Sequence, residues 1–100
     1  MKLKNDQVDI ICKYFEKQPV IQAFVFGSYA RNEATEQSDI DLLVELDYEK
    51  MTSGLQFITM QLELQELLNR KIDLVSTNGI SEHLQPFIEK DKILIYSRAK

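Results

Sequence analysis

Two aspartates separated by one residue, Asp39 and Asp41, are the first residues in this sequence whose spacing indicates chemistry. On a strand, such residues project to the same side, roughly 7 Å apart. Their carboxylates would repel each other, and a hard divalent cation would relieve the repulsion. Mg²⁺ binds proteins through one or two carboxylates and keeps positions for water and phosphate oxygens. This pattern is also typical of a solvated strand end, so the pair alone does not establish a metal site and other residues must point to the same chemistry.

A Gly27-Ser28 pair precedes Asp39 with ten residues between them. It directly follows a run of branched and aromatic residues that predicts a buried strand. Glycine lets the backbone approach a ligand closely, and the amides of the next turn could hold a phosphate beside the Ser28 hydroxyl. The pattern is neither a Walker loop nor a dinucleotide fingerprint, because the other glycines of those motifs are absent. A simple glycine turn that caps a helix is the alternative.

Two further residues could complete a phosphate and metal site. Asp73 lies inside an apolar strand pattern, where an acidic residue must be paired, exposed or bound to metal. If its strand neighbours that of Asp41, the three carboxylates meet; otherwise Asp73 is an exposed edge residue. Arg31 follows Ser28 by three residues, so it could contact a phosphate or pin an acidic side chain. Arg70 and Lys71 could also help to neutralise phosphates.

The elements that must position these residues alternate along the chain. Their order predicts an α/β fold with a sheet of about four strands and helices packed on it. They are a helix capped by Asn5 or Asp6 and ended by Pro19, strand 20–26, a turn at 28–32, strand 40–46, a helix from about 54 to 69 capped by Ser53, strand 71–76, a short helix capped by Ser81, and strand 92–96.

The long helix has an unusually broad apolar face made of two stripes. Either stripe could belong to the core, and the width also leaves room for a partner surface. One stripe comprises Leu55, Ile58 and Leu62, and the other comprises Phe57, Met60, Leu64 and Leu67.

Composition narrows the classes of function. A chain of 100 residues predicts one domain, 1–100. The net charge of −4 gives no basic stripe, so direct nucleic-acid binding is not expected. The single cysteine, Cys12, cannot form an internal disulfide, which indicates a reducing cytoplasm. No run of about 18 apolar residues is present, so no membrane span is expected.

Together, these motifs resemble the minimal nucleotidyltransferases of the DNA polymerase β superfamily. That family's pattern is Gly-Ser, ten residues, Asp-x-Asp and a third carboxylate on a later strand, which Gly27-Ser28, Asp39-Ile40-Asp41 and Asp73 match. The resemblance covers about residues 6 to 97. One departure is Asn32, where many members have glycine; asparagine is the next most tolerant residue of positive φ, so we expect the turn to survive.

The resemblance implies a nucleotidyltransferase fold with a mixed sheet and a Mg²⁺-dependent transfer from a nucleoside triphosphate. Asp39, Asp41 and Asp73 would bind one or two Mg²⁺ ions, with Asp73 as an alternative base for the nucleophile. Gly27, Ser28 and Arg31 would bind the phosphates. Stand-alone members commonly pair with a HEPN-domain toxin, and some transfer AMP from ATP to a tyrosine of that partner. We therefore expect a protein adenylyltransferase that acts as an antitoxin.

Two other functions stay open from the sequence. The chain could neutralise its partner by contact alone, with a nucleotide as a structural ligand. It could also transfer a nucleotidyl group to a small molecule, which would need a longer chain or a dimer to build the acceptor pocket. A homodimer and a hetero-oligomer both stay open. The base preference, the acceptor and the oligomeric state do not follow from these residues.

Overall fold

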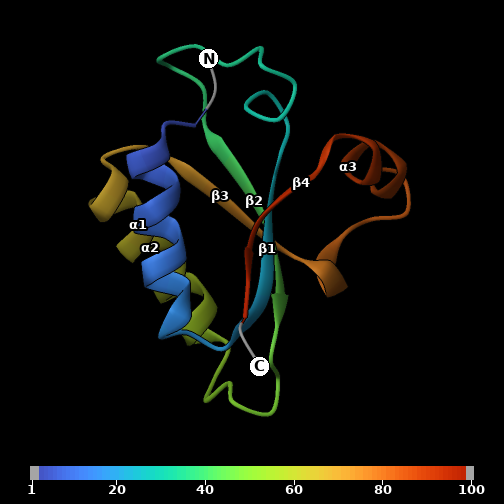
Figure 1. Ribbon diagram of the computed structural model, residues 1–100. Helices are drawn as coiled ribbons and strands as arrows, with labels where there is room; N and C mark the ends of the chain where they lie inside the picture. Colours follow the sequence, from blue (N-terminus) through green and yellow to red (C-terminus); the bar gives the residue numbers. More distant parts are fainter. Residues whose placement is uncertain (1–2, 99–100) are drawn as a thin grey trace.

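In the computed structural model, which describes residues 3–98, two long helices cover one face of a four-stranded sheet and a short helix lies on the other side (Figure 1). The strand order is β3-β2-β1-β4; β2 and β3 are parallel, and the other neighbours are antiparallel. The elements are α1 (Asn5–Glu16), β1 (Val20–Phe26), β2 (Ile40–Leu46), α2 (Leu55–Leu68), β3 (Ile72–Ser76), the 3-10 turn η1 (Thr77–Gly79), α3 (Gln85–Asp91) and β4 (Ile93–Ser97). This mixed-sheet α+β architecture confirms the predicted fold class.

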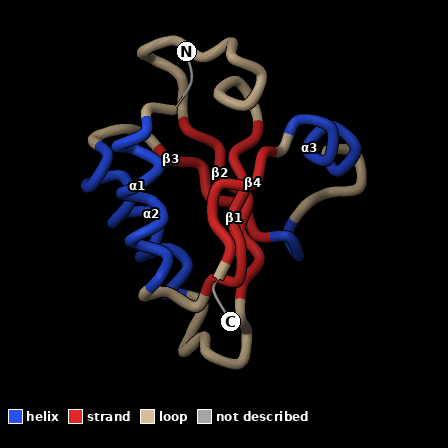
Figure 2. The backbone as a smooth tube through the Cα atoms, in the orientation of Figure 1, coloured by secondary structure: helices blue, strands red, loops and turns tan. Residues whose placement is uncertain are grey.

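The alternation of apolar and acidic residues in β2 separates the core from the opposite face of the sheet. Ile40, Leu42 and Val44 are all 0% exposed and belong to the main hydrophobic core. Successive side chains of a strand point to opposite faces, so Asp41 lies on the face that α1 and α2 leave uncovered (Figure 2). Burial of one face of β2 therefore orients the aspartate toward the other.

Only one of the two apolar stripes of α2 packs into the core. Met60, Leu64 and Leu68 are buried. The other stripe is solvent-exposed: Leu55, Ile58 and Leu62 have exposed fractions of 71%, 55% and 54%. Leu67, which the sequence grouped with the inner stripe, is also about half exposed.

The N-cap residues differ from the predicted ones by one to three positions, although Ser81 Oγ does accept a hydrogen bond from the backbone N–H of Leu84 at 3.3 Å. Each residue that was predicted as an N-cap lies close to the start of its helix, but another residue nearby occupies the N-cap position. The N-cap residues are Lys4, Gly54 and Leu84, where the sequence predicted Asn5 or Asp6, Ser53 and Ser81.

Side chains of α2 hold the edge strand β3 in place. The backbone N–H of Ile72 donates to Gln65 Oε1 at 3.2 Å, and that of Leu74 donates to Gln61 Oε1 at 3.3 Å. An edge strand otherwise leaves such groups unpaired. These two bonds flank Asp73 and therefore help to fix the position of its backbone. No helix within residues 3–98 is both long and apolar enough to span a bilayer.

Candidate active site

The parallel pairing of β2 and β3 places two of the predicted carboxylates side by side. Asp41 is in register with Asp73, so both side chains lie on the same face of the sheet. Asp39 immediately precedes β2 and shares that face by its spacing of two residues. The expectation that the strand of Asp73 neighbours that of Asp41 is thus confirmed, and the structure brings the three aspartates to one end of these strands.

Asp41 is the electrostatic centre of this group. Burial, followed by the negative charges of Asp73 and Asp39, raises the pKa of Asp41 from 3.8 to about 6, and the nearby charge of Arg31 opposes the rise. A carboxylate that is half-buried beside two like charges holds its proton more tightly than one in water. The site therefore disfavours full ionisation of its three carboxylates and would gain from a cation.

The turn after β1 is in direct contact with Asp41. Phe26, the last residue of β1, pairs with Asp41 across the antiparallel ladder. Gly27 has a φ of +72°, and a Cβ atom at this position would overlap the Asp41 carboxylate oxygen Oδ2. Glycine is therefore required twice at position 27, once by its backbone conformation and once by the space that the carboxylate occupies.

Backbone hydrogen bonds close the turn that follows. The N–H of Arg31 donates to the carbonyl oxygen of Gly27 at 3.1 Å, and the N–H of Glu33 donates to that of Ser28 at 2.8 Å. The first amides of a helical turn have no partner within the turn, and such amides can bind an anion. Asn32 has a φ of 60°, so asparagine does occupy a left-handed position here, as the sequence analysis expected.

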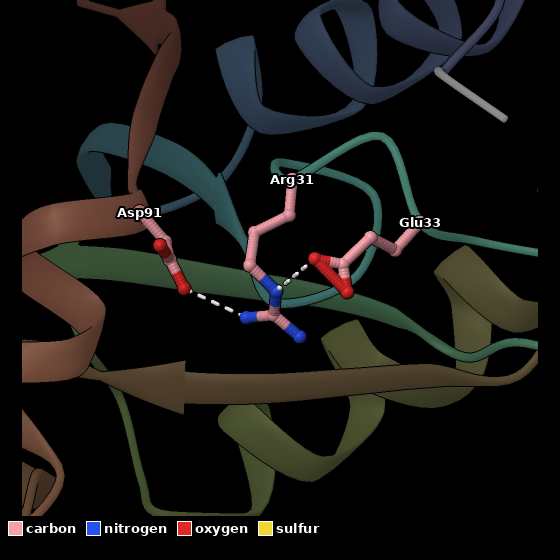
Figure 3. A network of polar contacts seen from close by, with 3 residues as sticks. All are labelled: Arg31, Glu33 and Asp91. Atoms are coloured by element: carbon pink, nitrogen blue, oxygen red, sulfur yellow. Dashed lines mark hydrogen bonds and ion pairs between the residues drawn. The ribbon is translucent and has the colours of Figure 1, made fainter.

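Arg31 bonds to acidic side chains, which was one of its two predicted roles. Its Nη1 lies 2.7 Å from Asp91 Oδ2, and its Nε lies 3.2 Å from Glu33 Oε1 (Figure 3). The bond to Asp91 ties the turn to the end of α3. Together with Phe26, Gly27 and Asp91, Arg31 also lines a recess of about 180 Å³ beneath α3. A phosphate would have to share Arg31 with these two carboxylates.

The sequence analysis missed the role of Arg70. Its Nη2 donates to the carbonyl oxygens of Thr35 and Ser38 at 3.2 and 3.1 Å and to the hydroxyl of Tyr29. Sequence reasoning offered Arg70 only as a charge for phosphates, because its partners lie 32 to 41 residues away. The neighbouring Lys71 is mostly exposed and lies 3.9 Å from Asp39 Oδ2.

The three aspartates fit the chemistry of Mg²⁺. Carboxylate oxygens are hard ligands, and Mg²⁺ usually takes one or two of them together with waters and substrate phosphates. In the part of the chain that the structure describes, no three His, Cys, Asp or Glu side chains form a ready-made metal cage. An Mg²⁺ ion held by one or two of these aspartates would keep positions open for water and phosphate oxygens.

Comparisons with known proteins identify the family of this chain. Residues 9–100 match the family model for the polymerase β nucleotidyltransferase domain. The protein adenylyltransferase MntA of Thermococcus cleftensis is 35% identical over 80 residues, which cover 80% of this chain and 79% of the relative. MJ0126 of Methanocaldococcus jannaschii, a candidate protein adenylyltransferase, is 44% identical over 81 residues, covering 80% of this chain and 81% of MJ0126.

Solved structures share the fold. One chain of a toxin–antitoxin crystal structure with AMP-PNP has a TM-score of 0.73 at 19% identity, with 94% of this chain and 74% of that chain covered. A candidate minimal nucleotidyltransferase has a TM-score of 0.63 at 34% identity, with 88% and 85% covered. The family model and the identity to relatives agree with the shared fold, so this chain belongs to the polymerase β family of nucleotidyltransferase enzymes.

Proposed function

We propose that this protein transfers AMP from ATP to a tyrosine hydroxyl of a HEPN-domain toxin, depends on Mg²⁺, and thereby acts as an antitoxin. The observation that carries the proposal is the Asp41–Asp73 register pair beside Gly27, which joins a carboxylate cluster to a turn suited to phosphate. The relative MntA is a protein adenylyltransferase, and MJ0126 is a candidate one. Structural neighbours include a tri-AMPylated HEPN toxin in complex with an MNT antitoxin, with a TM-score of 0.71.

In the proposed reaction, the acceptor oxygen attacks the α-phosphorus of ATP. A new oxygen–phosphorus bond forms, the bond between the α-phosphorus and the bridging oxygen breaks, and pyrophosphate leaves with that oxygen. Asp73, on the exposed edge strand, accepts the proton of the acceptor hydroxyl. Asp39 and Asp41 would hold Mg²⁺, which would supply charge neutralisation for the transfer, and Asp73 would join them as a ligand only if it does not act as the base.

The remaining site residues hold the triphosphate in this scheme. Amides after Gly27 and the Ser28 hydroxyl bind the terminal phosphates, since a turn of this kind directs several N–H groups at one anion. Arg31 stabilises the turn through Asp91, and it is placed to share its charge with a phosphate. Correct placement matters because the transfer depends on positioning and electrostatic stabilisation.

The exposed stripe of α2, comprising Leu55, Ile58 and Leu62, is the proposed docking surface for the toxin. Large apolar side chains at this spacing form one continuous face of a helix, and each of the three is more than half exposed. Contiguous apolar surface of this kind marks interaction sites. The helix carries Glu63 and Glu66 and no basic residue, so a partner helix with basic flanking residues would complement it. This pairing would make a hetero-oligomer.

We further propose that residues 1–100 act as one nucleotidyltransferase domain in the cytoplasm. The free thiol of Cys12 supports a reducing compartment, and ATP as the substrate agrees with it. The structure describes one sheet and one main core cluster within residues 3–98.

The experiment that tests the proposal measures intact mass of the HEPN-domain partner. The purified partner is incubated with this protein and Mg-ATP, and its mass is recorded before and after. We expect mass increments of one AMP unit. They should be absent with Asp41→Asn and should persist with Asp9→Asn, a matched carboxylate-to-amide change at an exposed position of α1.

Two results would contradict the catalytic proposal. Retained transfer by a folded Asp41→Asn protein would show that the carboxylate cluster is not the site. A stable, neutralised complex without any mass increment, unchanged in Asp41→Asn, would instead identify a binding module that acts by contact alone. Transfer to a small-molecule acceptor with none to the toxin would support the third alternative.

A further inference from the structure

We propose that Arg70 is a positioning residue that holds the segment between Gly27-Ser28 and Asp39 in its active arrangement. This inference rests on the proposed function, because it assigns a role in the same site. In this role, Arg70 supports the loop that joins the two halves of the motif and does not act as a phosphate ligand.

The contacts of one guanidinium group carry the proposal. Arg70 Nη2 donates to the backbone oxygens of Thr35 and Ser38, and the second of these residues directly precedes Asp39. The same nitrogen donates to the hydroxyl of Tyr29, the residue after Ser28. Arg70 therefore binds the two ends of the segment that separates the phosphate turn from the first aspartate.

The Tyr29 ring provides the second anchor. Tyr29 is 4% exposed and belongs to the main core. The guanidinium carbon of Arg70 lies 5.8 Å from the ring centroid, which is within the range of a cation–π contact. Burial fixes Tyr29 in the core. Because Arg70 contacts Tyr29, Arg70 also has a fixed position, and its bonds hold the loop in place relative to the core. Arg70 follows Asn69, which ends α2 in a left-handed conformation.

A lysine could not reproduce this arrangement. Arginine keeps a planar group over the Tyr29 ring while one end nitrogen reaches the loop, whereas lysine offers a point charge on a flexible stem. All three of these bonds are donated by Nη2, so Arg70 could contact a phosphate only through Nε or Nη1 while it stays on the loop. The neighbouring Lys71, which is 76% exposed and pairs with Asp39 instead of the backbone of residues 29–38, is the comparison cation for the loop measurement.

The test measures the loop itself before it measures catalysis. Amide hydrogen exchange is recorded on the ligand-free protein and on Arg70→Ala, Arg70→Lys, Tyr29→Phe and Lys71→Ala. We expect Arg70→Ala to raise exchange at residues 29–38 by about tenfold or more, since hydrogen bonds to charged groups are among the stronger ones. Arg70→Lys should behave similarly, Tyr29→Phe should show a smaller rise, and Lys71→Ala should match the wild type.

Kinetics then separate positioning from direct binding. With the HEPN partner as acceptor, Arg70→Ala should lower kcat by about 100-fold, the order expected for a small misplacement of reacting groups. The ratio of ATP to AMP affinity should stay unchanged, because no phosphate contact is lost. Millimolar guanidinium chloride should restore part of kcat in Arg70→Ala and none in Arg70→Lys, whose side chain fills the vacated space.

Three outcomes would overturn the proposal. Unchanged loop exchange with a selective loss of ATP affinity would make Arg70 a phosphate ligand. Unchanged exchange with unchanged kcat would deny it any role. If amide hydrogen exchange rose uniformly over β1 and β2 in Tyr29→Phe and in both Arg70 variants, Arg70 would be a residue that stabilises the whole fold. If the Arg70 variants show the loop effect but the wild type has no transferase activity, positioning stands and the proposed function fails.

Discussion

Replacing Asp41 with asparagine should stabilise the ligand-free protein at neutral pH. The charged carboxylate is half-buried on the open face of the sheet, beside the like charges of Asp73 and Asp39. Asparagine has nearly the same shape and carries no charge. The substitution therefore removes the repulsion and the desolvation of a charge while it leaves the contact with Gly27 in place.

The magnitude follows from proton linkage. The pKa of Asp41 is about 6 in the folded protein, above its ordinary value of 3.8, so the folded state binds more protons between these two values. Stability then falls as pH rises through this range, and the full penalty is present above about pH 6. A rise of about two pKa units corresponds to about 3 kcal/mol. Because the carboxylate is partly exposed, solvent screening reduces the expected gain to about 1–2 kcal/mol.

The assay is urea denaturation of wild type and Asp41→Asn in EDTA at about pH 4 and about pH 7.5, which bracket the range. We expect the variant to be more stable by about 1–2 kcal/mol at the higher pH and nearly equal at the lower. Asp9→Asn, on the exposed side of α1, serves as the control and should show no such pH-dependent gain. A destabilised Asp41→Asn protein, or a gain independent of pH, would refute the electrostatic reasoning.

Addition of Mg²⁺ with a nonhydrolysable ATP analogue should make the wild type more stable than Asp41→Asn. A ligand that binds only the folded state stabilises it in proportion to its affinity, by about 2.7 kcal/mol at a concentration one hundred times Kd. Wild type should gain this stabilisation, and Asp41→Asn should gain far less. An equal gain in both proteins would mean that Asp41 does not bind the metal.

Three further results are expected. Gly27→Ala should destabilise the protein by about 1–3 kcal/mol in urea denaturation and should abolish ATP binding, because the added Cβ would overlap the Asp41 carboxylate. A stable variant that binds ATP would contradict the close contact. Asn32→Ala should cost about 1 kcal/mol and Asn32→Gly almost nothing, because position 32 has a φ of 60°; equal thermal shifts would contradict this. Ile58→Asp should weaken binding of the HEPN-domain partner by at least about tenfold in calorimetry with unchanged Tm, whereas unchanged affinity would place the partner elsewhere.

The strand pattern and the motif could be predicted because they depend on local physics. Alternation of apolar and acidic residues in 40–46 indicated a strand with one buried face, and that face is 0% exposed at Ile40, Leu42 and Val44. The spacing of Asp39 and Asp41 determined that they share a side. Asn32 was expected to tolerate positive φ, and it does.

The helix caps and the outer stripe of α2 could not be predicted in the same way. Several residues near each helix start can serve as a cap, and the path of the incoming chain decides among them. Both stripes of α2 are equally apolar in sequence, so their periodicity predicts a broad face without saying which part is covered. Packing against α1 and the sheet buried Met60 and Leu64 and left Ile58 exposed.

The sequence by itself therefore determined the elements, the Gly-Ser turn and the Asp-x-Asp pair, because each depends on residues a few positions apart. Only the tertiary structure decided that Asp73 lies in register with Asp41, that Asp91 binds Arg31, and that Arg70 holds the loop before Asp39. These contacts join residues 32 to 60 positions apart. No local pattern encodes such pairs, because they form only when strand order and helix packing bring distant segments together.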